Sequence, residues 1–132
     1  PQNPMRQRFG ISVEYKDFYT MESQQERASR QPYYTLNSGY KMPLIGLGTD
    51  KIFDSTILTR AVSEIGYRFL DTASRYKNEH VVGETVQAVI SDGKLTRADL
   101  FVVTKVWMDE VEDVEAACRR SLEKLNLDYI YL

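Results

Sequence analysis

Hydrophobic and polar positions follow two alternating patterns along residues 33–132. Short apolar runs rich in β-branched or aromatic side chains are typical of strands, and they occur at residues 40–49, 67–71, 100–107 and 128–132. Apolar positions with a helical period lie between these runs, at residues 54–65, 79–92 and about 111–125. Strands that alternate with helices are typical of parallel βα units, so the pattern predicts the α/β fold class.

Residues 33–49 also predict a β-hairpin that precedes the first βα unit. Two strand-like segments are separated here by Asn-Ser-Gly, which is a turn sequence. Gly39 can adopt the positive φ that such a turn requires, because it has no Cβ atom.

Each predicted helix has one apolar face that we expect to be buried. Asp54 is a candidate amino-terminal cap of the first helix, and Gly66 is a candidate stop. The inward side chains of this helix are expected to be Ile57, Leu58, Ala61, Val62 and Ile65. Those of the second and third helices are expected to be Val82, Val86, Val89, Ile90, Val114, Cys118, Leu122 and Leu125.

Residues 1–31 lack these patterns and are interpreted as an amino-terminal extension of a domain over residues 32–132. Within the extension, four apolar residues share one helical stripe, namely Ile11, Tyr15, Phe18 and Tyr19. One interpretation is a loose tail or a helix that lies on its own domain. The other is that residues 9–22 dock onto a protein partner, because a freely solvated tail usually carries fewer aromatic residues.

Composition and charge exclude several classes of partner. Seventeen basic and nineteen acidic residues provide no broad positive field, so neither nucleic acid nor an anionic membrane is an expected partner. No apolar stretch approaches the ~18 residues that a membrane-spanning helix needs. Cys118 is the only cysteine, which excludes an internal disulfide and favours a reducing compartment such as the cytoplasm.

The segment "GLGT" at residues 46–49 resembles part of a dinucleotide-binding fingerprint, but Lys51 stands where the third glycine is needed. A β/α barrel instead gathers polar groups at the carboxyl ends of successive strands. Asp71 and Lys105 end two neighbouring predicted strands and are separated by 34 positions, about one βα unit. We therefore expect both side chains at one rim of a barrel.

Asp71, Lys105 and the nearby Tyr76 form a candidate catalytic group. A buried carboxylate and ammonium stabilise each other, and an ammonium lowers the pKa of a neighbouring phenol because it stabilises the phenolate. Such a phenol suits proton transfer near neutral pH. Each residue alone also has an ordinary interpretation, as a turn cap, a surface charge or a half-buried aromatic. His80 lies within the second predicted helix without partner ligands at suitable spacing, so we expect no metal site there.

Four segments of the sequence resemble a known family. "GYRFLDTASRYKNEHVVGETV" is similar to the aldo-keto reductase signature G-Y-R-H-I-D-T-A-x-x-Y-x-N-E-x-x-V-G, with Phe69 in the place of the histidine. "LFVVTKVW" resembles the strand of that family that ends in Thr-Lys-x-Trp. "LNSGYKMPLIGLGT" and "SLEKLNLDYIYL" resemble its opening hairpin with the first strand and its approach to the fourth strand. The resemblance covers residues 33–132.

The resemblance implies a (β/α)8 barrel of the TIM type that reduces small aldehydes and ketones with NADPH, and of which this chain carries the first four strands and three helices. By motif, Tyr76 would donate a proton, and Lys105 and Asp71 would tune it. Trp107 would form a wall of the substrate pocket. The residues expected near the NADP(H) cofactor are Gly48, Thr49, Lys51 and Asp71.

Four strands cannot close an eight-stranded barrel, and the catalytic histidine of the family is expected beyond Leu132. The chain alone is therefore expected to be inactive. Three interpretations follow: a portion of a longer reductase, a reductase-like fragment that serves a large cytoplasmic or cytoskeletal assembly, or a regulatory subunit that senses the nicotinamide redox state. In the second, a protein partner would cover the open half-barrel.

Overall fold

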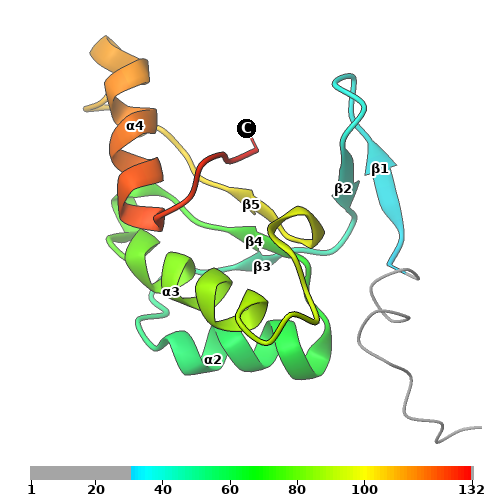
Figure 1. The fold of residues 1–132 in the computed structure, drawn as a ribbon. Helices are drawn as coiled ribbons and strands as arrows, with labels where there is room; N and C mark the ends of the chain where they lie inside the picture. Colours follow the sequence, from blue (N-terminus) through cyan, green and yellow to red (C-terminus); the bar gives the residue numbers. More distant parts are fainter. Residues whose placement is uncertain (1–30, 132) are drawn as a thin grey trace, which may run out of the picture.

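The computed structural model describes residues 31–131 (Figure 1). The extension predicted over residues 1–31 lies outside the described residues apart from Gln31, and so does its candidate docking segment at residues 9–22. In the described part, helices cover one face of a small parallel sheet, and a separate hairpin lies to one side of it (Figure 1).

The predicted hairpin is confirmed. Strands β1 (Tyr33–Thr35) and β2 (Lys41–Pro43) pair antiparallel, with Tyr34 opposite Met42. The turn between them places Gly39 at a φ of +86°, which is the left-handed region expected for this glycine.

Three short parallel strands form the sheet in the order β3-β4-β5, and they are β3 (Leu47–Gly48), β4 (Phe69–Asp71) and β5 (Phe101–Val103). Gly48 pairs with Asp71, and Asp71 pairs with Val103, so these residues form one row across the sheet. A parallel bridge from Val103 to Tyr131 adds the beginning of the fourth predicted strand. The order agrees with successive βα units, each strand pairing with the next along the chain.

The three predicted helices are present. They are α2 (Ser55–Arg60), which continues as a π-helical turn (Ala61–Ile65), α3 (Glu79–Ile90) and α4 (Val114–Leu125). Asp54 caps α2 as expected, because its carboxylate accepts a hydrogen bond from the Thr56 amide at 2.9 Å. Asp113 caps α4 in the same way through the Ala116 amide.

The hydrophobic core lies between the helices and one face of the sheet. Leu70 of β4 and Val102 of β5 point toward the helices and are fully buried. Their main buried partners are Leu58, Val62, Val82, Val86 and Leu125. This burial of both strands explains why their sequences are apolar runs.

The opposite face of the sheet carries aromatic rings. Phe69 and Phe101 are register partners on β4 and β5, and their ring centroids are 5.2 Å apart. The ring of Tyr131 stacks on Phe101 at 4.1 Å, and Tyr40 of the hairpin contacts Tyr131 edge to face. In a barrel this face is the interior, so the rings form part of an interior layer.

Two of the predicted helix faces are partly wrong. Ile57 and Ile65 were expected to be inward but are 55% and 68% exposed. The π-helical turn changes the angular spacing of residues after Arg60, which moves Ile65 away from the sheet. On α4, Val114 is 48% exposed, and the most buried positions are Ala117, Ser121 and Leu125.

Small residues explain the face that α4 buries. A Cβ atom built at Gly83 of α3 would lie 2.2 Å from the carbonyl oxygen of Leu125, at the end of α4. Ala117 and Ser121, which are also small, are buried on the same face of α4. Close approach therefore favours the small-residue face of α4 over the face with Val114.

We predict that Gly83→Ala lowers the free energy of unfolding by about 1–3 kcal/mol, because overpacking against a backbone carbonyl forces α3 and α4 apart. This loss exceeds the gain of about 0.5–1 kcal/mol that alanine brings to a helix interior. Urea unfolding of the two chains would measure it. Glu84→Ala, at an exposed position of the same helix, is the control and should stay within about 0.5 kcal/mol of wild type. Equal stability of Gly83→Ala and wild type would contradict the close approach.

Candidate active site

Asp71 and Lys105 meet at the carboxyl end of the sheet. Asp71 is the last residue of β4, and Lys105 follows β5 by two residues. The Nζ atom of Lys105 donates a hydrogen bond to Asp71 Oδ1 and another to the Thr72 carbonyl at 2.9 Å. The predicted convergence of the two side chains at one rim is therefore found in the structure.

Tyr76 completes this group. It ends a 3₁₀ turn (Ser74–Tyr76) that follows β4, and its hydroxyl lies 3.4 Å from Lys105 Nζ. The ammonium is also 5.0 Å from the centre of the Tyr76 ring. One ammonium therefore contacts both a carboxylate and a phenol, which is an arrangement suited to transfer of the phenol proton.

The ion pair faces partly open space, since the side chains of Lys105 and Asp71 are 41% and 37% exposed. Burial lowers the pKa of Lys105, but hydrogen bonds to Asp71 and Tyr76, together with the charges of both groups, outweigh it. The pKa of Lys105 is therefore raised above its ordinary value, and the lysine is a fixed cation at neutral pH.

The end of β3 brings two of the expected cofactor residues to Asp71. Thr49 is buried, and its amide and its hydroxyl both donate to the Asp71 carbonyl, at 2.9 and 3.0 Å. Gly48 pairs with Asp71 and is exposed, and a Cβ atom added there would meet no heavy atom within 4 Å. Lys51 is exposed in the following loop and has a φ of +62°.

Asn78 positions this rim, although the sequence analysis did not single it out. Its buried side-chain amide donates to the carbonyls of Thr49 and Ile52 at 2.6 and 2.8 Å. Its oxygen accepts from the Thr72 hydroxyl at 3.2 Å. Asn78 thus ties the loop after β3 to the end of β4. The sequence feature that could have identified Asn78 is the Asn78-Glu79 pair within the signature segment.

The neighbouring Glu79 was missed as well. This carboxylate is almost fully buried and accepts from the Thr104 hydroxyl at 2.7 Å. Lys124 of α4 lies 3.7 Å from its other oxygen. Glu79 therefore connects α3 both to the residue beside Lys105 and to α4.

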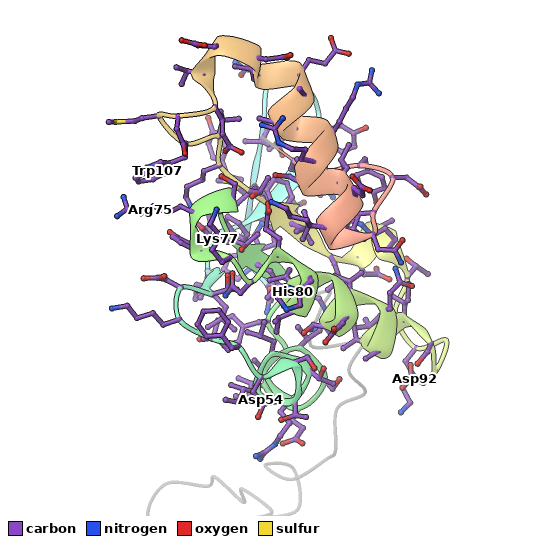
Figure 2. The ribbon with its side chains drawn as sticks, turned by 90° about the vertical axis from the view of Figure 1, so that its left-hand side faces the viewer. Asp54, Arg75, Lys77, His80, Asp92 and Trp107 are labelled. Carbon is purple, nitrogen blue, oxygen red and sulfur yellow. The ribbon has the colours of Figure 1, made fainter. Side chains whose placement is uncertain are left out.

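Trp107 lies next to the candidate group rather than within it. Its half-buried ring packs against the guanidinium of Arg75, which lies 4.5 Å from the ring centre (Figure 2). Arg75 belongs to the turn that carries Tyr76. The side chain predicted to line the substrate pocket therefore contacts the turn that carries the predicted proton donor.

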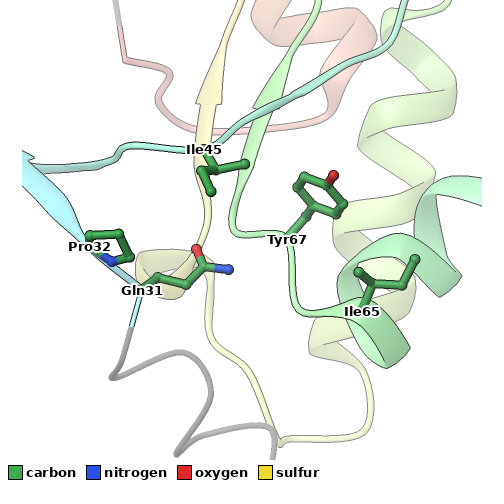
Figure 3. Close-up of a pocket in the computed structure, with 5 residues that line it drawn as sticks. All are labelled: Gln31, Pro32, Ile45, Ile65 and Tyr67. Carbon is green, nitrogen blue, oxygen red and sulfur yellow. The ribbon is translucent and has the colours of Figure 1, made fainter.

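The remaining predicted features lie elsewhere. His80 is exposed on α3 (Figure 2). Among residues 31–131, no group of three or more His, Cys, Asp or Glu side chains could hold a metal ion, and no helix is long and apolar enough to cross a membrane. A pocket of about 200 Å³ is lined by Gln31, Pro32, Ile45, Ile65 and Tyr67 (Figure 3). It lies at the amino ends of β3 and β4, away from Asp71 and Lys105.

Residues 45–132 match the Aldo/keto reductase family, and this match spans the whole candidate site. The chain belongs to the aldo/keto reductase family. It is 42% identical over 102 residues to an NAD(P)H-dependent D-xylose reductase of Pachysolen tannophilus, and 43% identical over 101 residues to an NADP-dependent D-sorbitol-6-phosphate dehydrogenase of Malus domestica. These alignments cover 76% and 74% of this chain and 32% of each relative.

Solved aldo/keto reductases have the same fold. The structure matches an aldo-keto reductase of Bombyx mori in complex with NADP, with a TM-score of 0.69 and 39% identity over 76% of this chain and 36% of that one. It matches an aldo/keto reductase of Brucella melitensis with a TM-score of 0.67 and 33% identity, over 76% of this chain and 39% of that one. These relatives are (β/α)8 barrels, as predicted for this chain. The chain spans about a third of the length of the curated relatives it matches.

The raised pKa of Lys105 predicts a pH dependence of stability. Because the folded state raises this pKa, the lysine stabilises the fold fully below its ordinary value of 10.5, and this stabilisation is lost as the pH rises through the folded pKa. The free energy of unfolding should fall more steeply above pH 10.5 in wild type than in Lys105→Met. Urea unfolding at a series of pH values from roughly 8 to 12, a range around the titration of lysine, would measure the two slopes.

Lys51→Met removes an exposed lysine from the same rim and serves as the control. It should keep the wild-type slope. Identical slopes for Lys105→Met and wild type would show that Lys105 does not stabilise the fold through its charge.

Proposed function

We propose that the protein to which this chain contributes reduces small aldehydes and ketones with NADPH, and that Tyr76 is the proton donor. The observation that carries this proposal is the contact of one ammonium, that of Lys105, with both the Asp71 carboxylate and the Tyr76 hydroxyl. Membership of the family and the reductase names of its relatives support the reaction class.

In the proposed reaction, the Tyr76 hydroxyl donates its proton to the carbonyl oxygen of the substrate. NADPH, when bound, supplies the hydride that reduces the carbonyl carbon. Lys105 stabilises the phenolate that remains, because its ammonium lies 3.4 Å from the hydroxyl. Asp71 fixes the ammonium in place and balances its charge.

The rim offers a suitable place for part of the cofactor. Gly48 is exposed beside the partly exposed Asp71, and the space above its Cα is open, so a planar ring system could approach the backbone here. We propose that Gly48, Thr49, Lys51 and Asp71 contact NADP(H). Of these residues, only Lys51 has a cationic side chain that could attract a phosphate.

Trp107 is proposed to line the substrate pocket, since it lies beside Arg75 and the turn of Tyr76. The substrate must also be oriented by residues from the remainder of a barrel, which includes the histidine expected beyond Leu132. For that reason, we propose that residues 1–132 alone do not turn over NADPH.

We predict that Tyr76→Phe lowers kcat/KM for reduction of a generic aldehyde by roughly 10²- to 10⁴-fold in the full-length protein, because the proton donor is removed. NADPH consumption followed by absorbance would measure this. Tyr34→Phe removes a hydroxyl from an exposed position of the hairpin and is the matched control, with wild-type activity expected. An unchanged rate in Tyr76→Phe would refute the assignment of the proton donor.

A second candidate function is that of a reductase-like component of a larger cytoplasmic assembly, either structural or sensing the nicotinamide redox state. Several large apolar side chains of the described residues are exposed, and they include Tyr34, Ile45, Phe53, Ile65 and Met108. Exposed apolar surface of this kind favours burial against more protein, which a partner docked through residues 9–22 would help to provide.

The mass of the native polypeptide distinguishes the two candidates. The longer reductase predicts a mass more than twice the 15.3 kDa of these residues, whereas the assembly component predicts about 15.3 kDa. Mass spectrometry of the protein purified from its source would decide. Each result contradicts the other candidate.

A further inference from the structure

Glu110 connects the two segments that carry the candidate active site. Its Oε2 atom accepts a hydrogen bond from the Ser74 hydroxyl at 2.5 Å and another from the Trp107 amide at 3.1 Å. Ser74 begins the turn that ends at Tyr76, and Trp107 follows Lys105 by two residues. One oxygen of the Glu110 carboxylate therefore joins the turn that carries Tyr76 to the loop that begins at Lys105.

The surroundings of Glu110 favour its ionised form. The hydrogen bond from Ser74 lowers the pKa of Glu110 most, followed by that from the Trp107 amide. Arg120 of α4 lies 3.4 Å from the other carboxylate oxygen and lowers the pKa further. The Glu110 side chain is only 17% exposed, so its hydrogen bonds are partly protected from water.

The two segments also make contacts that do not involve the Glu110 carboxylate. The Ser74 amide donates to the Lys105 carbonyl at 3.4 Å, and the Arg75 guanidinium packs on the Trp107 ring at 4.5 Å. The Glu110 amide in turn donates to the Trp107 carbonyl at 2.9 Å, which closes a tight turn over residues 107–110. The Ser74–Glu110 bond is the shortest of these connections and joins residues 36 positions apart.

We propose that Glu110 is a positioning residue for the candidate active site. It holds the turn Ser74–Tyr76 against the loop at residues 105–110, and so fixes the Tyr76 hydroxyl relative to the Lys105 ammonium and the orientation of Trp107. Glu110 acts through Ser74 and the Trp107 amide rather than by touching the proton donor. The effect on catalysis rests on the proposed function, whereas the connection between the two segments does not.

The connection can be tested without activity in a polypeptide of residues 1–132, because Trp107 is the only tryptophan among these residues. In Glu110→Ala, the loop loses its bond to Ser74, so the fluorescence of Trp107 should shift to longer wavelength and acrylamide should quench it more strongly. Glu110→Gln keeps one acceptor oxygen and should give an intermediate value. Ser74→Ala should reproduce part of the Glu110→Ala effect, since it removes the same bond.

Glu112→Ala is the matched control, because it removes an exposed carboxylate two residues further along the chain, in the 3₁₀ turn Val111–Asp113. Its fluorescence should equal that of wild type. Circular dichroism of every variant shows whether the helices remain, and Glu110→Gln with Ser74→Ala carries the test if Glu110→Ala does not fold. Wild-type emission and quenching in folded Glu110 and Ser74 variants would overturn the proposal.

The catalytic effect is measured in the full-length protein. A misplaced proton donor should lower kcat by up to about 10²-fold. The KM for NADPH should change little. If a variant only lost folded protein, its apparent kcat would fall in proportion to the folded fraction. Ser74→Ala combined with Glu110→Ala should lose little more than Glu110→Ala alone, because the two residues share one bond.

The two proposals can fail separately. A full-length wild type that does not consume NADPH would contradict the proposed function, while the fluorescence experiment would still test the connection through Glu110. An active wild type with full kcat in Glu110→Ala would overturn the positioning role and leave the proposed function intact.

Discussion

The parallel pairing of β3, β4 and β5 determines where every candidate group lies. Gly48, Asp71 and Val103 form one row, and the row is extended by hydrogen bonds from the Thr49 amide to Asp71 and from the Thr72 amide to Val103. Alternate residues of a strand point to the same face, so Lys105, two residues after Val103, shares the face of Asp71. A register slip of one residue would turn Lys105 toward the helices and separate the charges.

Buried polar side chains keep this register from slipping at the rim. Asn78 holds the loop after β3 and the end of β4, and Glu79 holds the residue that precedes Lys105. Asn78 makes three hydrogen bonds, and Glu79 makes one and has Lys124 3.7 Å from its other oxygen. Both side chains have almost no access to water, so the loss of either set of contacts would cost about 1–3 kcal/mol. The site is consequently built on the same contacts that stabilise the fold, and its geometry cannot relax independently of them.

The sequence predicted those features that depend on local pattern or regular spacing. The cap at Asp54, the turn at Gly39 and the meeting of Asp71 with Lys105 follow from residue type and position along the chain. The exposure of Ile65 and Val114 did not follow, because a π-helical turn and a close contact at Gly83 select faces that the apolar periodicity does not reveal. Glu110 was equally hidden, since a carboxylate in a charged loop has no pattern that names its distant partner Ser74.

The ring of Phe69 packs edge to face on Phe101, which stacks on Tyr131, and this cluster would have a consequence for a barrel closed around it. The interior of an eight-stranded barrel has a nearly fixed volume that side chains fill at crystal-like density. Three large rings, contributed by β4, β5 and the segment that follows α4, lie in contact on this face of the sheet. In a closed barrel, strands that faced these rings would need small side chains at that height, so the shape of this half would restrict the composition of the other.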